Sequence, residues 1–381
     1  MNFIKSFQQG QAGKNFGLST GIKNLDIAMD GIQRKSIYGV AAGPKVGKTT
    51  LVDLCFVIEP YLFYLEELKK NPATTITLKI FYNSFEIDRI RKEFKYAAHF
   101  FFRDYGIGTF THNGKLYPMS PRYLEGKLKD SDGQMIKVSP DHIRILGQIY
   151  ENRIVPLFGR YDENGHKIEH GIIEFVEERD NPTGLRNTLM DYATQHGSFV
   201  YQKYTTKNEL NQVVHKQRII GYKSNNPDEY VLTVTDHLRK LKKERNYSLK
   251  ENVDKWIEYS VELRNWCGYS FIHVIHLNRS ISDVSRIKYF KDKLYPTGDD
   301  VKDTGNLSEE CDYLITLFNP QDEKYNITMH FDVDIRNIPN YRSLHLVESR
   351  DTECPQHLQL EMMGGINYFT PINREALISN E

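Results

Sequence analysis

Residues 42–49, with the sequence AGPKVGKT, have the residue types and the spacing of a phosphate-binding loop. Small residues let backbone N–H groups close around a triphosphate, and the N-terminus of a following helix adds partial positive charge. Lys48 would reach the β- and γ-phosphates, and the hydroxyl of Thr49 would take one position on Mg²⁺. We therefore expect ATP and Mg²⁺ as cofactors. The residues expected at the nucleotide are Ala42, Gly43, Pro44, Lys45, Val46, Gly47, Lys48, Thr49 and Thr50.

Two acidic residues follow apolar runs that are typical of strands. Asp236 ends the run 230–236, where a carboxylate can hold Mg²⁺ beside the phosphate loop; an ordinary acid at the start of a turn is the alternative. Glu86 follows the run 75–82, where it could orient and deprotonate an attacking water. The same spacing suits an acid stabilised by the dipole of a helix N-terminus. We expect Asp236 to be a metal ligand together with Thr49, while the spacing alone leaves Glu86 open.

The composition is that of a globular protein, with 39% hydrophobic and 26% charged residues in a chain of 381. No apolar run approaches the length of a membrane span, and the N-terminal residues lack the apolar core of a secretion signal. The four cysteines are far apart, which argues against a zinc module and for reduced thiols. We expect a cytoplasmic protein (in the host cytoplasm if the chain is viral). Because the formal net charge is zero, a nucleic-acid partner has to be held by local basic patches.

The order of apolar runs indicates an α/β fold with a mostly parallel central sheet. A strand at 36–41 leads into the phosphate loop and a helix at 50–61, and the strand 75–82 leads into a helix at 87–102. Parallel strands joined by helices bring their carboxyl ends to one edge, where nucleotide binds. Ser248 and Glu251 form a capping box that begins a further helix. The remaining core strands are expected at 153–158, 230–236, 270–275, 313–317, 327–333 and 343–348.

Residues 105–150 interrupt this order with turn signals that are typical of β-hairpins. Asn113-Gly114, Asp132-Gly133 and Asn164-Gly165 each lie between alternating polar and apolar residues. We therefore expect a β-hairpin-rich insertion at about 105–150 and further decoration at 160–225. The decoration should include a helix at 181–196 and strands at 199–201 and 218–220.

Several short motifs, in a fixed order, resemble those of RecA-type ATPases of the DnaB replicative helicase family. The run 17–26 and the run 31–33 precede the phosphate loop, as in that family. Residues 276–280, His-Leu-Asn-Arg-Ser, are similar to its usual Gln-Leu-Asn-Arg motif, and 304–312 resembles the segment that follows it. The matches cover about 14–105, 150–200 and 228–370. The resemblance implies a RecA-like P-loop NTPase domain at 17–375, between a flexible N-terminal tail at 1–16 and a C-terminal tail at 376–381.

The resemblance also implies roles for single residues. It makes Glu86 the catalytic base and Asp236 the Mg²⁺-associated acid, and it places His276 at the γ-phosphate sensor, where an imidazole N–H can donate as an amide does. Arg350 fits an arginine finger that acts in trans on a neighbouring subunit, although Glu348 stands where the family usually has Lys. A surface Arg in a simple salt bridge and a strand-end His without nucleotide contact are the alternatives for Arg350 and His276.

Two basic stretches follow the strands 230–236 and 270–275. In a ring of RecA-type subunits, loops at these places line the central pore, where cations bind DNA phosphates and aromatic rings such as Tyr289 and Phe290 could stack on bases. A solvated helix or loop face is the alternative. The residues expected to bind single-stranded DNA are Arg239, Lys240, Lys242, Lys243, Arg245, Arg279, Arg286 and Lys288.

We therefore expect an ATP-hydrolysing DNA helicase or translocase of the replicative, DnaB-like type. It would act on single-stranded DNA as a ring oligomer, a hexamer by resemblance, with other replication proteins as partners and no membrane. Replicative DnaB proteins also carry an N-terminal helical domain, whereas about 16 residues precede the match here. Two other functions fit the sequence: a RecA- or RadA-like recombination ATPase that forms filaments, and a nucleotide-gated assembly or binding protein with weak hydrolysis. His276 and Glu348 favour the last.

Overall fold

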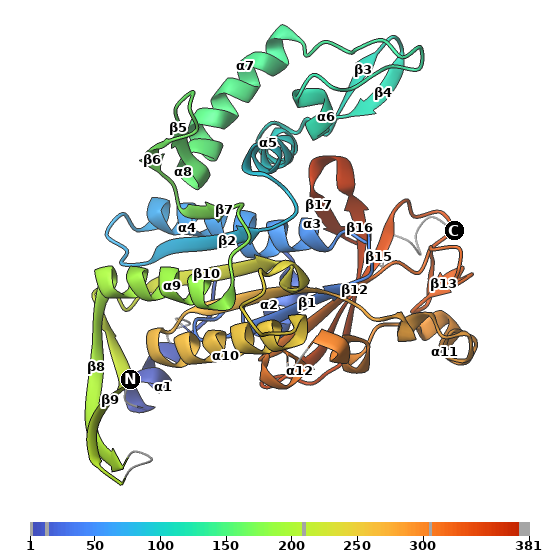
Figure 1. Ribbon diagram of the computed structural model, residues 1–381. Helices are drawn as coiled ribbons and strands as arrows, with labels where there is room; N and C mark the ends of the chain where they lie inside the picture. Colours follow the sequence, from blue (N-terminus) through green and yellow to red (C-terminus); the bar gives the residue numbers. More distant parts are fainter. Residues whose placement is uncertain (1–2, 12–14, 208–210, 305–306, 373–381) are drawn as a thin grey trace.

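The core of the protein is a nine-stranded sheet, seen in a computed structural model that describes residues 3–11, 15–207, 211–304 and 307–372. The strand order is β17-β16-β15-β12-β1-β11-β10-β2-β7 (Figure 1). The strands from β12 to β7 run parallel, and β15, β16 and β17 are antiparallel additions. This confirms the expected α/β class with a mostly parallel sheet. The bounds are β1 Ile37–Ala42, β2 Thr77–Ser84, β7 Ile173–Val176, β10 Glu229–Asp236, β11 Ser270–His276, β12 Tyr313–Phe318, β15 Tyr341–Ser349, β16 Gln356–Met363 and β17 Tyr368–Pro371.

Helices cover both faces of the sheet, because its central strands are buried on both sides (Figure 1). In β1, Tyr38 and Val40 face one core, and Ile37 and Ala41 face the other. Asn181 caps α9, and Ser248 with Glu251 forms the expected capping box of α10. The first core includes α2 (Lys23–Met29), α3 (Lys48–Asp53), the π-helical turn Leu54–Ile58, α4 (Glu59–Lys70) and α5 (Arg89–Tyr105). The second includes α9 (Pro182–His196), α10 (Leu249–Cys267) and α12 (Leu307–Glu310).

The register of the parallel strands brings their carboxyl ends together. Ala42, the last residue of β1, pairs with His276 on β11 and with Leu317 on β12. Asp236, the last residue of β10, pairs with Val274 on β11 and with Ser84 on β2. The phosphate loop, Asp236, His276 and the segment after β2 therefore lie along one edge of the sheet. We call it the carboxyl edge, and the opposite one the amino edge.

The insertion between α5 and β7 contains more helix than the sequence suggested. The hairpin predicted at Asn113-Gly114 is formed by β3 (Thr109–His112) and β4 (Lys115–Pro118), and the one at Asn164-Gly165 by β5 (Gly159–Tyr161) and β6 (Lys167–His170). Asp132-Gly133 instead makes a turn that is closed by a single bridge between Lys129 and Met135. Two helices, α6 (Pro121–Leu124) and α7 (Pro140–Ile149), form much of the rest.

The core strand predicted at 153–158 is wrong. Those residues are helical, because a π-helical turn, Tyr150–Ile154, continues α7 into α8 (Val155–Phe158). A short apolar run cannot be distinguished from a buried helix by periodicity alone. Leu157 and Phe158 are buried in the first core, and Pro156, which lacks the N–H that a sheet ladder needs, lies in the first turn of α8. The outer parallel strand is β7 instead.

The strands expected at 199–201 and 218–220 belong to one long hairpin, β8 (Gly197–Lys207) with β9 (Val213–Ser224), which we call the arm. At the N-terminus, expected to be a flexible tail, α1 (Phe3–Gln11) is helical. The strand predicted at 327–333 is reduced to a small ladder, β13 (Met329–His330) with β14 (Val333–Asp334). The expected tail at 376–381 lies outside the described residues. The remaining elements are α11 (Val284–Phe290) and the 3₁₀ turns Leu238–Lys240, Arg279–Ser282, Lys291–Lys293, Gly298–Thr304 and Gly364–Ile366.

Candidate nucleotide-binding site

The phosphate loop joins the end of β1 to the first turn of α3, as its sequence predicts. Gly47 has a φ of 112°, and a Cβ at this position would overlap the sulfur of Met362 on β16. The loop is held from β15 as well, since Arg342 Nε donates to the carbonyl oxygen of Val46 at 2.8 Å. The antiparallel strands beside β12 therefore shape the loop. The sequence gave no signal for Arg342, which lies 296 positions from Val46.

Thr49 and Asp236 meet at the mouth of this loop. Thr49 Oγ1 donates to Asp236 Oδ2 at 2.9 Å, while Oδ1 of Asp236 is buried and has no hydrogen-bond partner. Burial raises the pKa of Asp236, and the charge of Lys92 opposes that rise. A hydroxyl and a carboxylate with a spare oxygen are the hard ligands that Mg²⁺ prefers. The two residues thus fit the metal that the loop implies, and Mg²⁺ bound there would neutralise phosphate charge.

Lys48 and His276 also contact each other, with Nζ of Lys48 lying 3.4 Å from Nδ1 of His276. Burial lowers the pKa of His276, and the neighbouring Lys48 lowers it further, so the imidazole is neutral at neutral pH. Because an ammonium only donates, Nδ1 has to accept, which leaves the ring proton on Nε2. His276 can therefore donate one N–H to a phosphate oxygen, as the amide of Gln would.

Glu86 is positioned by two residues that follow β10. Its carboxylate lies 3.6 Å from His237 Nε2 and 3.7 Å from Lys240 Nζ. Burial and the charges nearby lower the pKa of His237 to about 3, so the ring is neutral and Lys240 supplies the ionic contact. The side chain of Glu86 stays 40% exposed, which leaves room for a water or substrate beside it. Lys240, expected to bind DNA, therefore faces the candidate base.

Behind the phosphate loop, an ion pair joins α3 to α5. Asp53 follows Thr49 by one helical turn, and its Oδ1 accepts from Lys92 Nζ at 2.6 Å and from Tyr82 and Tyr96 at 2.8 and 3.1 Å. The side chains of Asp53 and Lys92 are both fully buried. A buried pair of this kind fixes geometry, because neither partner tolerates the loss of the other. Sequence reasoning missed the pair, since its members are 39 positions apart.

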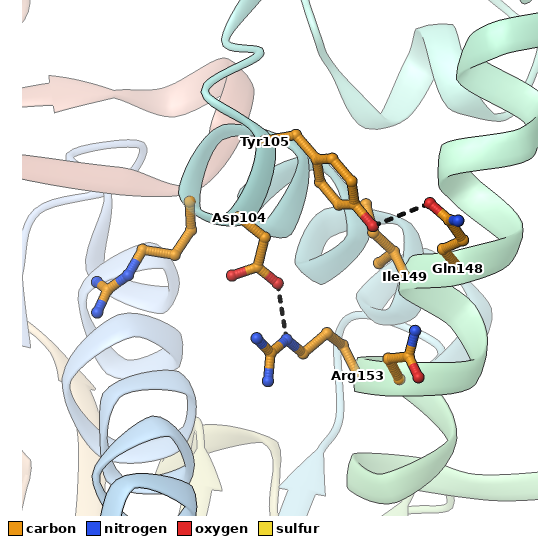
Figure 2. A pocket seen from close by; sticks show the side chains of 7 residues that line it. Asp104, Tyr105, Gln148, Ile149 and Arg153 are labelled. Atoms are coloured by element: carbon orange, nitrogen blue, oxygen red, sulfur yellow. Dashed lines mark hydrogen bonds and ion pairs between the residues drawn. The ribbon is translucent and has the colours of Figure 1, made fainter.

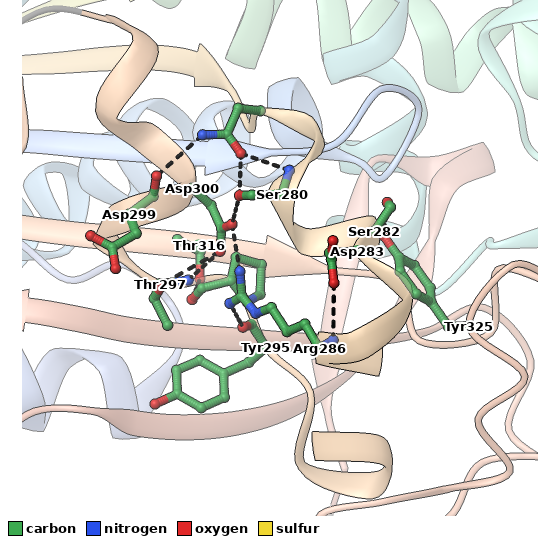
Figure 3. Close-up of polar contacts among 12 residues, drawn as sticks. Ser280, Ser282, Asp283, Arg286, Tyr295, Thr297, Asp299, Asp300, Thr316 and Tyr325 are labelled. Carbon is green, nitrogen blue, oxygen red and sulfur yellow. Dashed lines mark hydrogen bonds and ion pairs between the residues drawn. The ribbon is translucent and has the colours of Figure 1, made fainter. Parts of the chain in front are cut away.

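The basic residues expected at DNA divide into two groups. Most of them are exposed and follow the carboxyl ends of β10 and β11: Arg239, Lys242, Lys243, Arg245, Arg279 and Lys288. Arg286 differs, because it donates to the buried carboxylate of Asp300 at 2.6 Å and to the carbonyl of Tyr295 at 2.9 Å (Figure 3). Arg286 therefore fastens the segment after β11 to the body of the protein, and Lys288 on the same short helix stays free to meet a ligand.

Arg350 lies at the amino edge, away from the phosphate loop of its own chain. It contacts Asp312 Oδ1 at 3.3 Å and the carbonyl of Glu309 at 3.3 Å. The neighbouring Ser349 pairs with Tyr313 at the start of β12, whereas the phosphate loop follows the residue that pairs with Leu317. The two levels are about 13 Å apart along the strand. Any role for Arg350 in hydrolysis therefore has to be played on another subunit.

The largest cavity found among the described residues lies elsewhere, between α5 and α7 (Figure 2). It has a volume of about 620 Å³ and is crossed by a contact of 2.7 Å between Arg153 and Asp104, while Tyr105 donates to Gln148 at 3.2 Å. None of the phosphate-loop residues lines it. Its lining is already self-paired, so we place the nucleotide at the carboxyl edge and not in this cavity.

No family model and no curated protein matches the sequence. Solved structures do match the fold. A DnaB-like replicative helicase, studied with its interactions with primase, aligns over 97% of this chain and 66% of its own, with 13% identity and a TM-score of 0.57. The ATPase domain of a helicase, solved by itself, aligns over 97% of both chains, with 13% identity and a TM-score of 0.55. Similarity at this level concerns architecture. The fold of this chain is the RecA-like fold of DnaB-type helicase ATPase domains.

Proposed function

We propose that this protein is an ATP-hydrolysing, magnesium-dependent DNA helicase or translocase of the replicative, DnaB-like type, which acts on single-stranded DNA as a ring, a hexamer by analogy. The observation that carries the proposal is the contact between Thr49 and Asp236, with Lys48 and His276 beside it at the carboxyl edge. A loop that binds phosphate for another purpose needs neither the acid nor the sensor at these places.

Each residue of the site has a task in this proposal. The loop amides and Lys48 hold the phosphates, and His276 donates its Nε2 proton to an oxygen of the γ-phosphate. Glu86 accepts a proton from the attacking water. Arg350 from a neighbouring subunit would stabilise the charge that develops on the transferred group, which makes the site complete only in an oligomer.

Lys240 offers a physical link between DNA and hydrolysis. Without DNA its ammonium lies 3.7 Å from Glu86, where its charge makes the carboxylate a weaker base. The exposed cations Arg239 and Lys242 flank it. A DNA phosphate bound by these residues would draw Lys240 away and free Glu86. Binding of DNA would thereby raise the rate of hydrolysis.

The test is to measure ATP turnover with and without single-stranded DNA and to image the particles with a non-hydrolysable nucleotide. We expect closed rings and turnover that DNA stimulates. Lys240→Met should raise the turnover measured without DNA and reduce the stimulation. Helical filaments would contradict the ring and favour the recombination ATPase.

A second function, a nucleotide-gated assembly protein with weak hydrolysis, is favoured by one feature of the site. Glu348 on β15 stands near Arg350 in place of the usual Lys, so the finger carries one cation and one anion. In that case turnover stays slow and does not respond to DNA, although nucleotide still binds.

A further inference from the structure

The arm formed by β8 and β9 projects from the body of the protein, away from the sheet (Figure 1). Its base is anchored, since Tyr222 Oη donates to the carbonyl of Ala193 on α9 at 2.8 Å and its ring packs on Phe199. Beyond the base the side chains are mostly exposed, including Tyr201 at 51% and Tyr204 at 41%. A two-stranded ribbon gains little stability by itself. The body of the protein does not need its outer part for packing.

The charge of the arm differs from that of the chain. Residues 197–224 contain a single acid, Glu209, whereas the whole chain is neutral. Their cations are Lys203, Lys207, Lys216, Arg218 and Lys223, all of them exposed. A concentration of one sign on a projecting element attracts a polyanion, and the neutral remainder does not oppose it.

Strand pairing distributes these cations over both faces of the ribbon. Residues that pair directly share a face, so Lys216 lies beside Tyr204 on one face, and Arg218 stacks over the same ring at 5.8 Å. Lys203 pairs with Gln217 on the opposite face. A partner that surrounds the ribbon on two sides therefore meets cations on each side.

We propose that the arm binds duplex nucleic acid by inserting into the major groove, with its cations on the phosphates of both walls. A two-stranded ribbon has the width that this groove admits. Lysine, arginine and tyrosine hydroxyl groups supply phosphate contacts without sequence readout. A single strand would engage only one face. The arm shares its ligand class with the proposed function, and in this respect rests on it, but uses a different site.

The position of the arm supports this division. β9 ends at Ser224 and β10 begins at Glu229, so the arm leaves from the amino edge. The exposed cations Arg239 and Arg279 follow the other ends of β10 and β11. The protein thus offers two basic surfaces, one at each edge. A second copy of the arm is a poor occupant, because edge-to-edge pairing would bring like charges together.

The test measures binding of a labelled 20-base-pair duplex by fluorescence anisotropy, without nucleotide and over a range of salt concentrations. The variant K203Q/K216Q/R218Q should bind the duplex at least about tenfold more weakly and show a salt slope smaller by about three, because each phosphate contact releases counterions. The control K23Q/K69Q/K129Q removes three exposed lysines elsewhere and should bind as the wild type does.

Three results would overturn the proposal: equal affinity of the arm variant and the wild type, an equal loss in the control, or an arm-dependent preference for a single strand of the same sequence. A change of oligomer mass with unchanged duplex affinity would make the arm a subunit contact instead. Because no nucleotide is present, duplex binding can persist even if the protein hydrolyses nothing. Failure of the proposed function and failure of this inference are therefore separable.

Discussion

The two edges of the parallel sheet carry extensions that are built in opposite ways. At the carboxyl edge, Lys48, Thr49 and Asp236 are buried or half-buried and contact one another or their neighbours. At the amino edge, the arm holds its side chains in solvent on both faces. Substitutions that share partners couple, whereas exposed and separate ones add. The carboxyl edge should therefore respond as a unit, and the arm residue by residue.

The largest effect is expected at the centre of the carboxyl edge. Lys48→Ala removes the ammonium that faces the β- and γ-phosphates, and we expect nucleotide affinity to fall by on the order of 100-fold or more, to the point of no measurable binding. Equilibrium binding of a fluorescent ATP analogue checks this. Lys45→Ala, in the same loop but exposed, is the control and should bind nearly as the wild type does. Wild-type affinity in Lys48→Ala would remove the loop from nucleotide binding.

Hydrolysis should respond next. Glu86→Gln keeps the shape of the side chain but removes the base, so turnover should fall by roughly 10²- to 10⁴-fold while nucleotide affinity stays within a few-fold. Steady-state hydrolysis and the same binding assay separate the two quantities. If binding and turnover fell together, Glu86 would be a structural acid at the start of α5, as the spacing alone allowed.

The placement of these catalytic candidates was predictable, because it follows from topology. Asp236 and His276 end apolar runs, and parallel strands align such ends beside the phosphate loop. Glu86 needed the family resemblance, since its spacing also suits a helix N-terminus.

The contacts that hold the site were not predictable. Arg342 reaches Val46 across the antiparallel strands, and Lys92 reaches Asp53 between two helices. Such pairs depend on side-chain packing between distant segments, which leaves no periodic signal in the sequence. For the same reason residues 153–158 gave a false strand, because burial on one side of a helix and burial in a sheet produce the same apolar run.

The buried pair behind the loop should set stability. Lys92→Met leaves Asp53 charged and unpaired in a dry environment, and we expect the free energy of unfolding to fall by about 3–5 kcal/mol. Lys70→Met, whose ammonium lies 3.2 Å from Glu67 at the surface, is the matched control and should cost less than about 1 kcal/mol. Urea denaturation measures both. The double variant Lys92→Met/Asp53→Leu should recover much of the loss, and an additive loss would show that the pair is not coupled.

Acid should weaken Mg²⁺-dependent nucleotide binding. Burial raises the pKa of Asp236, and only its ionised form is a good Mg²⁺ ligand, so affinity should fall as pH decreases through that raised pKa, by up to about tenfold per pH unit. Titrations of the nucleotide analogue between neutral and acidic pH test this, with Mg²⁺ and with a chelator. The pH dependence should be much smaller with the chelator and in Asp236→Asn. Equal pH profiles with and without Mg²⁺ would assign the dependence to another group.

The smallest effects on folding are expected in the arm. Lys216→Ala and Ile220→Ser each change an exposed side chain, since Ile220 is 53% exposed, and we expect the free energy of unfolding to change by no more than about 0.5 kcal/mol. The two changes should also add when combined, because the residues do not pair with each other. Thermal and urea denaturation of the single and double variants test both points. A loss of 2 kcal/mol or more, estimated as the level typical of buried positions, would mean that the arm packs against another subunit in solution, and the contrast between the two edges would then disappear.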